Sequence, residues 1–209
     1  LDSISDAAAT DVANKIFVVG GSYSGAQYLN GHAVEIGSAN APVHFDNYVF
    51  AGTLNENVGD LSLKFVSGSA SRVYGAATTE GSFSAGNINL EIGRDVTLSD
   101  RVGAGKVDGG SLKTGDVTIS VAGNLTNLYG GAQSWNSGVV THKSVTLNFS
   151  GSAYALYGAG YASNGGTLIV ENDVVVNASG SQSTSYFYAA GSSMHGSVIS
   201  INGSVTTNV

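Results

Sequence analysis

The sequence predicts an all-β fold, a right-handed parallel β-helix (solenoid) of about seven coils with one sequence repeat per coil. Two apolar patterns support this class because they recur with the same period of about 28 residues. The composition is a third indication: 30 of the 209 residues are glycine and one is proline. So much glycine argues against a helical protein, and so little proline excludes collagen. The right-handed sense is expected because parallel crossovers are almost always right-handed.

The first pattern is a phrase made of an apolar residue, usually an aromatic residue, and two small residues. Its seven copies are Val18-Val19-Gly20-Gly21, Val49-Phe50-Ala51-Gly52, Val73-Tyr74-Gly75-Ala76, Val102-Gly103-Ala104-Gly105, Leu128-Tyr129-Gly130-Gly131, Leu156-Tyr157-Gly158-Ala159 and Phe187-Tyr188-Ala189-Ala190. We expect the small pair to lie at a tight corner of each coil, where a larger side chain would clash.

The second pattern is a short alternation of apolar and polar residues, which is typical of a half-buried strand. Its members are Val34/Ile36, Leu61/Leu63/Phe65, Ile88/Leu90/Ile92, Val117/Ile119/Val121, Val145/Leu147/Phe149, Leu168/Val170 and Ile199/Ile201. The central residues Leu63, Leu90, Ile119 and Leu147 are expected to point inward and to form one apolar stack. Each repeat then contains about three short strands joined by turns.

The order of elements along the chain suggests two regions. Residues 1–15 fit no coil and form an N-terminal lead or cap, in which residues 6–13 have the propensity for one or two helical turns. Residues 16–209 form the solenoid. Turns vary in length, and the longest gap, from Val170 to Phe187, contains an additional strand at Val174–Val176 and a serine-rich excursion. Because the last residues, 204–209, stop in mid-coil without a polar cap, we expect the chain to be a piece of a longer rod.

Charge and cysteine content limit the partners and the compartment. The formal net charge is −7 and the sequence has no basic stripe, so a nucleic-acid partner is not expected. The absence of cysteine is mild evidence for a bacterial surface or secreted protein. No signal peptide and no apolar stretch of membrane-spanning length is visible in this sequence.

The repeats resemble the passenger domains of bacterial autotransporters and, more broadly, the β-helical adhesins of Gram-negative bacteria. The resemblance covers about residues 16–209. It rests on the Leu-Tyr-Gly-Ala/Gly phrases and on strands such as Ser144-Val145-Thr146-Leu147-Asn148-Phe149-Ser150-Gly151. It implies exposure at the cell surface, attachment to the outer membrane through a β-barrel translocator outside this chain, and adhesion or self-association. A minority of such passengers are proteases or esterases, usually through an added domain that this sequence lacks.

Catalytic and cofactor motifs are scarce, and neither an enzyme nor a cofactor is expected. The four histidines do not have the spacing of a metal site. Asp95 and Asp100 are the candidates for a glycosidase pair, and a β-helix carbohydrate-active enzyme, a polysaccharide lyase or hydrolase, is the alternative function. More simply, both aspartates are turn residues on a solvated rim. Arg72 and Arg101 occupy the same register one coil apart and would repel one another unless an acid such as Asp100 lies between them.

The aromatic residue of the phrase is the better candidate for function. Phe50, Tyr74, Tyr129, Tyr157 and Tyr188 share one register, interrupted at Gly103. If the preceding residue of each faces the core, alternation places these rings outside, where they could contact sugar rings or another protein. The simpler interpretation is a ladder that stabilises stacking. We therefore expect an adhesin or self-association module that binds host glycan, protein or another copy of itself through a lateral face, with Tyr74, Tyr129, Tyr157 and Tyr188 as candidate ligand-binding residues. A passive stalk that spaces other domains remains a further alternative.

Overall fold

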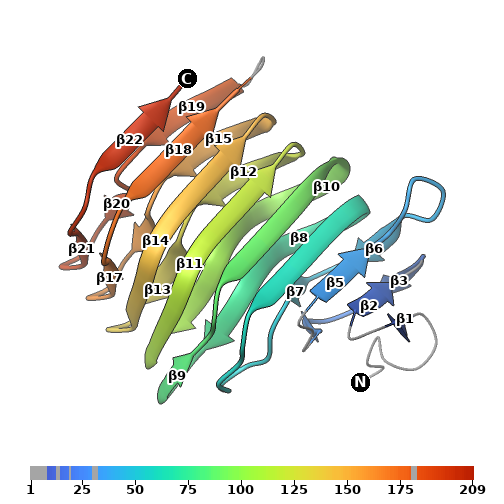
Figure 1. Cartoon of the computed structure of the whole chain (residues 1–209), viewed down its shortest axis with the longest axis horizontal. Coiled ribbons are helices and arrows are strands. Elements are labelled where there is room, and N and C mark those ends of the chain that lie inside the picture. Colours follow the sequence, from blue (N-terminus) through green and yellow to red (C-terminus); the bar gives the residue numbers. More distant parts are fainter. Residues whose placement is uncertain (1–8, 13–14, 19, 30–32, 180–182) are drawn as a thin grey trace.

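The structure is a computed structural model that describes residues 9–12, 15–18, 20–29, 33–179 and 183–209. Within these ranges every regular element is a strand, and parallel strands stack into a β-solenoid of about six turns. The chain climbs the near side of the solenoid in Figure 1, descends behind it and advances towards the C-terminal end. This winding is right-handed, as the sequence predicted.

From β8 (Leu61–Thr78) onward each turn passes through four stacks of paired strands, whereas the described strands before β8 belong to stacks I and II or pair with their edge. Stack I consists of β2 (Lys15–Val18), β5 (Ala33–Ile36), the first part of β8 (Leu61–Thr78), the first part of β10 (Ile88–Asp108), the end of β11 (Ser111–Val121), the end of β14 (Val139–Phe149), β18 (Val174–Ala178) and β22 (Val205–Asn208). Stack II consists of β3 (Gly21–Tyr23), β4 (Gln27–Tyr28), β6 (Val43–Phe45), β7 (Tyr48–Phe50), the middle of β8 and of β10, β12 (Asn124–Tyr129), β15 (Ser152–Tyr157) and β19 (Ser183–Tyr188).

The other two stacks complete the turn. Stack III contains the last residues of β8 and β10, β13 (Ala132–Trp135), β16 (Gly160–Ala162) and β20 (Ser192–Ser193). Stack IV contains β9 (Ser82–Ser84), the first parts of β11 and β14, β17 (Thr167–Val170) and β21 (Val198–Ile201). A turn therefore has four strand segments rather than the expected three.

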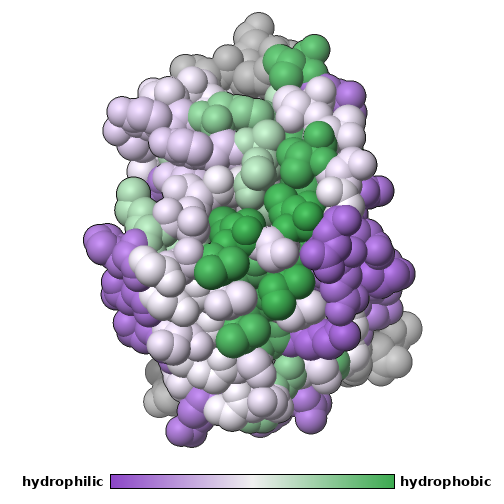
Figure 2. Space-filling view, turned by 90° about the vertical axis from the view of Figure 1, so that its left-hand side faces the viewer, coloured by the Kyte–Doolittle hydropathy of each residue, from purple (hydrophilic) through white to green (hydrophobic). Residues whose placement is uncertain are grey.

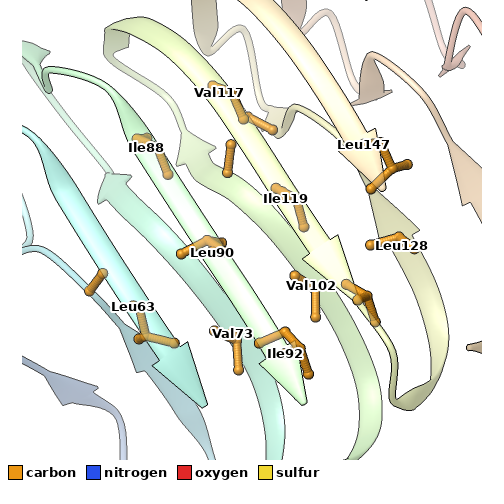
Figure 3. Close-up of a cluster of buried hydrophobic side chains, with 14 of the residues drawn as sticks. Leu63, Val73, Ile88, Leu90, Ile92, Val102, Val117, Ile119, Leu128 and Leu147 are labelled. Atoms are coloured by element: carbon orange, nitrogen blue, oxygen red, sulfur yellow. The ribbon is translucent and has the colours of Figure 1, made fainter. Parts of the chain in front are cut away.

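The apolar core fills the lumen, and the predicted inward stack is confirmed. Leu63, Leu90, Ile119 and Leu147 pair in one continuous register and are fully buried. Figure 3 shows these side chains on neighbouring strands of stack I, facing Val73, Val102 and Leu128 of stack II across the lumen. Alternation along a strand explains this, because every second side chain points to the same face.

Two register predictions are wrong. Val170 and Ile201 belong to stack IV, and the residue equivalent to Phe149 in the next turn of stack I is Ala178 on β18. Stack IV alternates as strongly as stack I, so periodicity alone could not separate them. In the first turn Val18 pairs with Ile36 in stack I, and Tyr28 occupies the aromatic position of the phrase instead of Val19.

The predicted N-terminal helical turns are not present in the described part of their segment. Ala9–Val12 forms strand β1, which pairs antiparallel with β2, while residues 6–8 and 13 lie outside the described residues. The backbone of so short a segment gains more hydrogen bonds by pairing with the edge of stack I than by forming an isolated helical turn.

The predicted tight corner between stacks II and III is confirmed by the space around its small residues. A Cβ atom added to Gly130 would lie 2.0 Å from the carbonyl oxygen of Gly158, and one added to Gly158 would lie 1.8 Å from that of Ala189. Both distances are far below van der Waals contact, so only glycine fits where successive turns approach this closely.

Candidate functional site

The aromatic column exists, and it runs along the corner between stacks II and III. Tyr28, Phe50 and Tyr74 stack in three successive turns, with ring centroids 4.7 and 5.5 Å apart. After the interruption at Gly103, Tyr129, Tyr157 and Tyr188 stack in the next three, with centroids 5.0 and 5.1 Å apart. Tyr28 is a member that sequence reading missed, because neither an apolar residue before it nor a small pair after it marks the phrase.

The expectation that all these rings lie exposed is wrong for the middle of the column. Phe50, Tyr74 and Tyr129 are 2, 0 and 4 % exposed, whereas Tyr157 is half-buried and Tyr188 is 40 % exposed. The rings do point out of the lumen, as alternation requires. They are covered because the outer surface is concave at the corner, so that outward side chains of stack II contact outward side chains of stack III.

Contacts across the corner show this directly. The Tyr74 hydroxyl donates a 2.6 Å hydrogen bond to Oε1 of Gln133, which lies two turns further along the rod. The ring of Tyr161 lies 6.1 Å from that of Tyr129 and 5.8 Å from that of Tyr157. Because Gly103 has no side chain, the Tyr74 ring can lean across that turn, and a Cβ atom at Gly103 would lie 3.5 Å from its Cδ1 atom.

The turn that lacks an aromatic ring carries a charged cluster instead. Asp100 accepts hydrogen bonds from Nε of Arg72 at 2.5 Å and from Nε of Arg101 at 2.7 Å. An acid therefore separates the two arginines, as predicted. Arg72 also donates to the Tyr48 hydroxyl and lies 4.5 Å above the centre of the Tyr48 ring. The cluster packs beside Tyr74 and contributes to the cover over the buried part of the column.

Asp100 is poorly placed to act as a catalytic acid. Partial burial by itself would raise its pKa, but the hydrogen bonds and positive charges of Arg101 and Arg72 outweigh burial and hold the pKa below the ordinary value. A carboxyl of this kind stays ionised, whereas a glycosidase acid needs a raised pKa. Asp95, the other candidate of the pair, is exposed on β10.

Towards the C-terminal turns the corner opens into an exposed surface rich in tyrosine. We call this surface the tyrosine face and define it by Trp135, Tyr154, Tyr157, Tyr161, Tyr186 and Tyr188. Neighbouring rings contact one another: Tyr154 lies edge-on to Tyr186 at 5.2 Å, Tyr186 lies parallel to Tyr188 at 6.4 Å, and Trp135 lies 5.9 Å from Tyr161. Sequence reading missed Tyr154, Tyr161, Tyr186 and Trp135, because they lie outside the aromatic position of the phrase.

The tyrosine face presents neutral hydroxyl groups and ring edges. Burial and the neighbouring tyrosines raise the pKa of Tyr157, and a hydrogen bond with Tyr186 raises the pKa of Tyr154. These phenols therefore remain protonated at neutral pH and can both donate and accept hydrogen bonds. The near-parallel stacking of Tyr157 with Tyr188, at 5°, covers their facing ring surfaces.

Other apolar residues are exposed at the C-terminal end of the described solenoid. Figure 2 views the molecule from that end and shows a band of apolar residues running across it. Phe187, Val198 and Val205 are 42, 52 and 41 % exposed there. Phe187 pairs in register with Leu156, a lumen position, so its exposure follows from its place in the last turn. It is therefore not counted as part of the tyrosine face.

Among the described residues, no group of three or more histidine, aspartate or glutamate side chains is arranged to hold a metal ion. No helix in the described part of the chain is both long and apolar enough to cross a bilayer.

Comparison with known proteins gives no relative from which a function could be transferred. No protein-family model, no curated protein and no solved structure matches the chain.

Proposed function

We propose that this chain is a non-catalytic binding module that recognises a protein surface through its tyrosine face. The main support is the exposure of Tyr154. Its side chain is 55 % exposed although its strand, β15, is not the last of stack II and pairs with β19 of the next turn. Unlike Phe187, Tyr154 does not owe its exposure to a place in the last turn of the solenoid. Clustered exposed aromatic residues are typical of interaction sites.

The chemistry of the face favours a protein partner over a glycan. Sugars bind best to the flat face of an aromatic ring, and the stacking of Tyr157 on Tyr188 covers the ring surfaces that face each other in that pair. The face offers hydroxyl groups, ring edges and short polar neighbours such as Thr126 and Asn127. Surfaces composed of tyrosine with small polar residues are the type that antibodies use to recognise proteins.

The proposed setting is the outside of a Gram-negative bacterium, as part of an autotransporter passenger anchored through a translocator elsewhere in the parent protein. The repeat style described above supports this setting, and so does a long β-solenoid without cysteine. The partner is then a protein on a host cell or a second copy of this chain. The carbohydrate-active alternative is disfavoured, because Asp100 is held ionised between two arginines.

The test compares the wild-type chain with the double variant Tyr154→Ser/Tyr186→Ser. Both rings are about half exposed, so the variant should fold normally. Binding of the fluorescent chain to cultured epithelial cells tests for a host protein, and sedimentation velocity over a range of concentrations tests for self-association. We expect the double variant to weaken whichever interaction occurs by at least about tenfold, as loss of clustered aromatic contacts usually does.

Tyr28→Ser is the matched control, because Tyr28 is 41 % exposed but lies at the opposite end of the aromatic column. It should bind as the wild type does. Pretreating the cells with trypsin should abolish binding, while periodate oxidation of glycans should not. Equal binding by the double variant, or binding that only periodate removes, would overturn the proposal, and so would a wild-type chain that neither binds cells nor self-associates.

A further inference from the structure

Among the described residues, His142 is the one histidine that lies inside the lumen of the rod. His142, on β14, is fully buried between Thr114 of the preceding turn and Val170 of the next. Its ring also lies against the corner backbone, since a Cβ atom added to Gly131 would approach its Cδ2 atom to 3.1 Å. His142 therefore supports the inner side of the segment whose outer side carries Tyr129 and Gln133.

Only one of the two ring nitrogens of His142 has a hydrogen-bond partner. Nδ1 lies 2.7 Å from Oγ1 of Thr114, and Thr114 Oγ1 also lies 3.1 Å from the carbonyl oxygen of Gly115. Nε2 is buried and has no hydrogen-bond partner in the described structure. A neutral imidazole needs one proton on either nitrogen, whereas an imidazolium needs an acceptor at both.

Nothing nearby would stabilise a second proton. The titratable side chains on or next to the strands packed against His142 are Lys113, Asp116, Lys143 and Glu171. They lie towards the outside, where Lys113 Nζ pairs with Glu171 Oε1 at 3.1 Å and Lys143 Nζ pairs with Asp116 Oδ2 at 2.9 Å. β13 and β17 contribute no ionisable side chain. A second proton on the ring would create a buried, uncompensated charge and would leave the Nε2–H group without an acceptor.

We propose that His142 makes the solenoid sensitive to acid, because its protonation opens the structure locally around β14 and its partners β11 and β17. This local opening needs no external ligand, because water that enters the opened lumen solvates the imidazolium. It also does not depend on the proposed binding function. Opening would release the backbone that carries Tyr129 and Gln133, because the ring rests against Gly131.

The size of the effect follows from linkage between protonation and opening. Burial lowers the pKa of His142 to about 4 from its ordinary 6.5. The opened state regains the ordinary pKa and binds more protons below that value, so acid favours opening. Between pH 7 and pH 5 the equilibrium constant for opening should rise by about twentyfold, and by about one hundredfold at pH 4.

Hydrogen exchange of the purified chain measures this directly, after correction for the pH dependence of intrinsic exchange. Amides of β11, the first part of β14 and β17 should lose protection as the pH falls from 7 to 4, by the factors just stated. The His142→Leu variant should remove that pH dependence while keeping the fold at pH 7, because leucine suits a lumen position and the Thr114 hydroxyl can still donate to the carbonyl oxygen of Gly115. His44→Leu is the matched control, because His44 is exposed on β6, and it should behave as the wild type does.

An independent measurement covers the case in which His142→Leu fails to fold. The nitrogen chemical shifts of His142 in the wild-type chain should report a neutral imidazole, with one protonated and one unprotonated nitrogen, down to about pH 4.5. Titration of this imidazole near pH 6.5 in the folded protein would overturn the proposal. The same holds for unchanged protection at pH 4, or for acid-induced opening that persists in His142→Leu.

Discussion

Truncation of Ile119 to alanine tests the inward register that positions every other residue of the rod. Ile119 is fully buried and stacks between Leu90 of the preceding turn and Leu147 of the next. The lost transfer energy of three carbon atoms is about 2.4 kcal/mol, at about 0.8 kcal/mol per buried methylene. Strand pairing on both sides prevents collapse of the site, so a remaining cavity should add about 1 kcal/mol or more. We therefore expect a loss of about 3–4 kcal/mol.

The assay is native-state hydrogen exchange of β11 and β14, because a stacked solenoid need not unfold in one step. Thr118→Ala is the matched control. Thr118 is the neighbour of Ile119 on the same strand and its side chain points outward, so truncation should cost less than about 1 kcal/mol. If Thr118→Ala were the costly variant and Ile119→Ala the neutral one, the register would be shifted by one residue and every side chain would face the other way.

Three further predictions concern the corner and its charged cluster. Tyr129→Ser should destabilise the chain by about 3–5 kcal/mol, because this ring is buried, whereas Tyr154→Ser should change stability by less than about 1 kcal/mol; urea unfolding compares the two. Gly158→Ala should cost at least about 3 kcal/mol, since its Cβ would meet a backbone oxygen, and loss of protection in β15 and β19 would report it. Asp100→Asn should cost about 1–2 kcal/mol at pH 7 through weakened hydrogen bonds to two arginines. Because the folded pKa of Asp100 is lowered, this difference should shrink as the pH falls from 7 through the ordinary pKa range of aspartate and below it, and a difference that grows on acidification would contradict the assignment.

Two-residue alternation and the spacing of the repeats predicted the parts of the fold that depend on neighbouring residues along one strand. Alternation placed Leu90 and Ile119 in the lumen, and the common period placed Arg72 and Arg101 in one register with Asp100 between them. The same rules assigned Val170 to the wrong stack, because stacks I and IV alternate alike and only strand pairing distinguishes them. The candidate site was identified in part: the column was found, but the exposed residue Tyr154 was not.

The sequence by itself determined the solenoid, its core and the column of aromatic residues, because these depend on a two-residue alternation and a repeat of about 28 residues. Only the tertiary structure decided which of those rings a partner could reach. Burial of Tyr74 depends on Gln133, which lies 59 residues away, and on the inward angle of the corner between stacks II and III. Exposure is a property of the surface that distant segments form together, so a pattern within one strand cannot specify it.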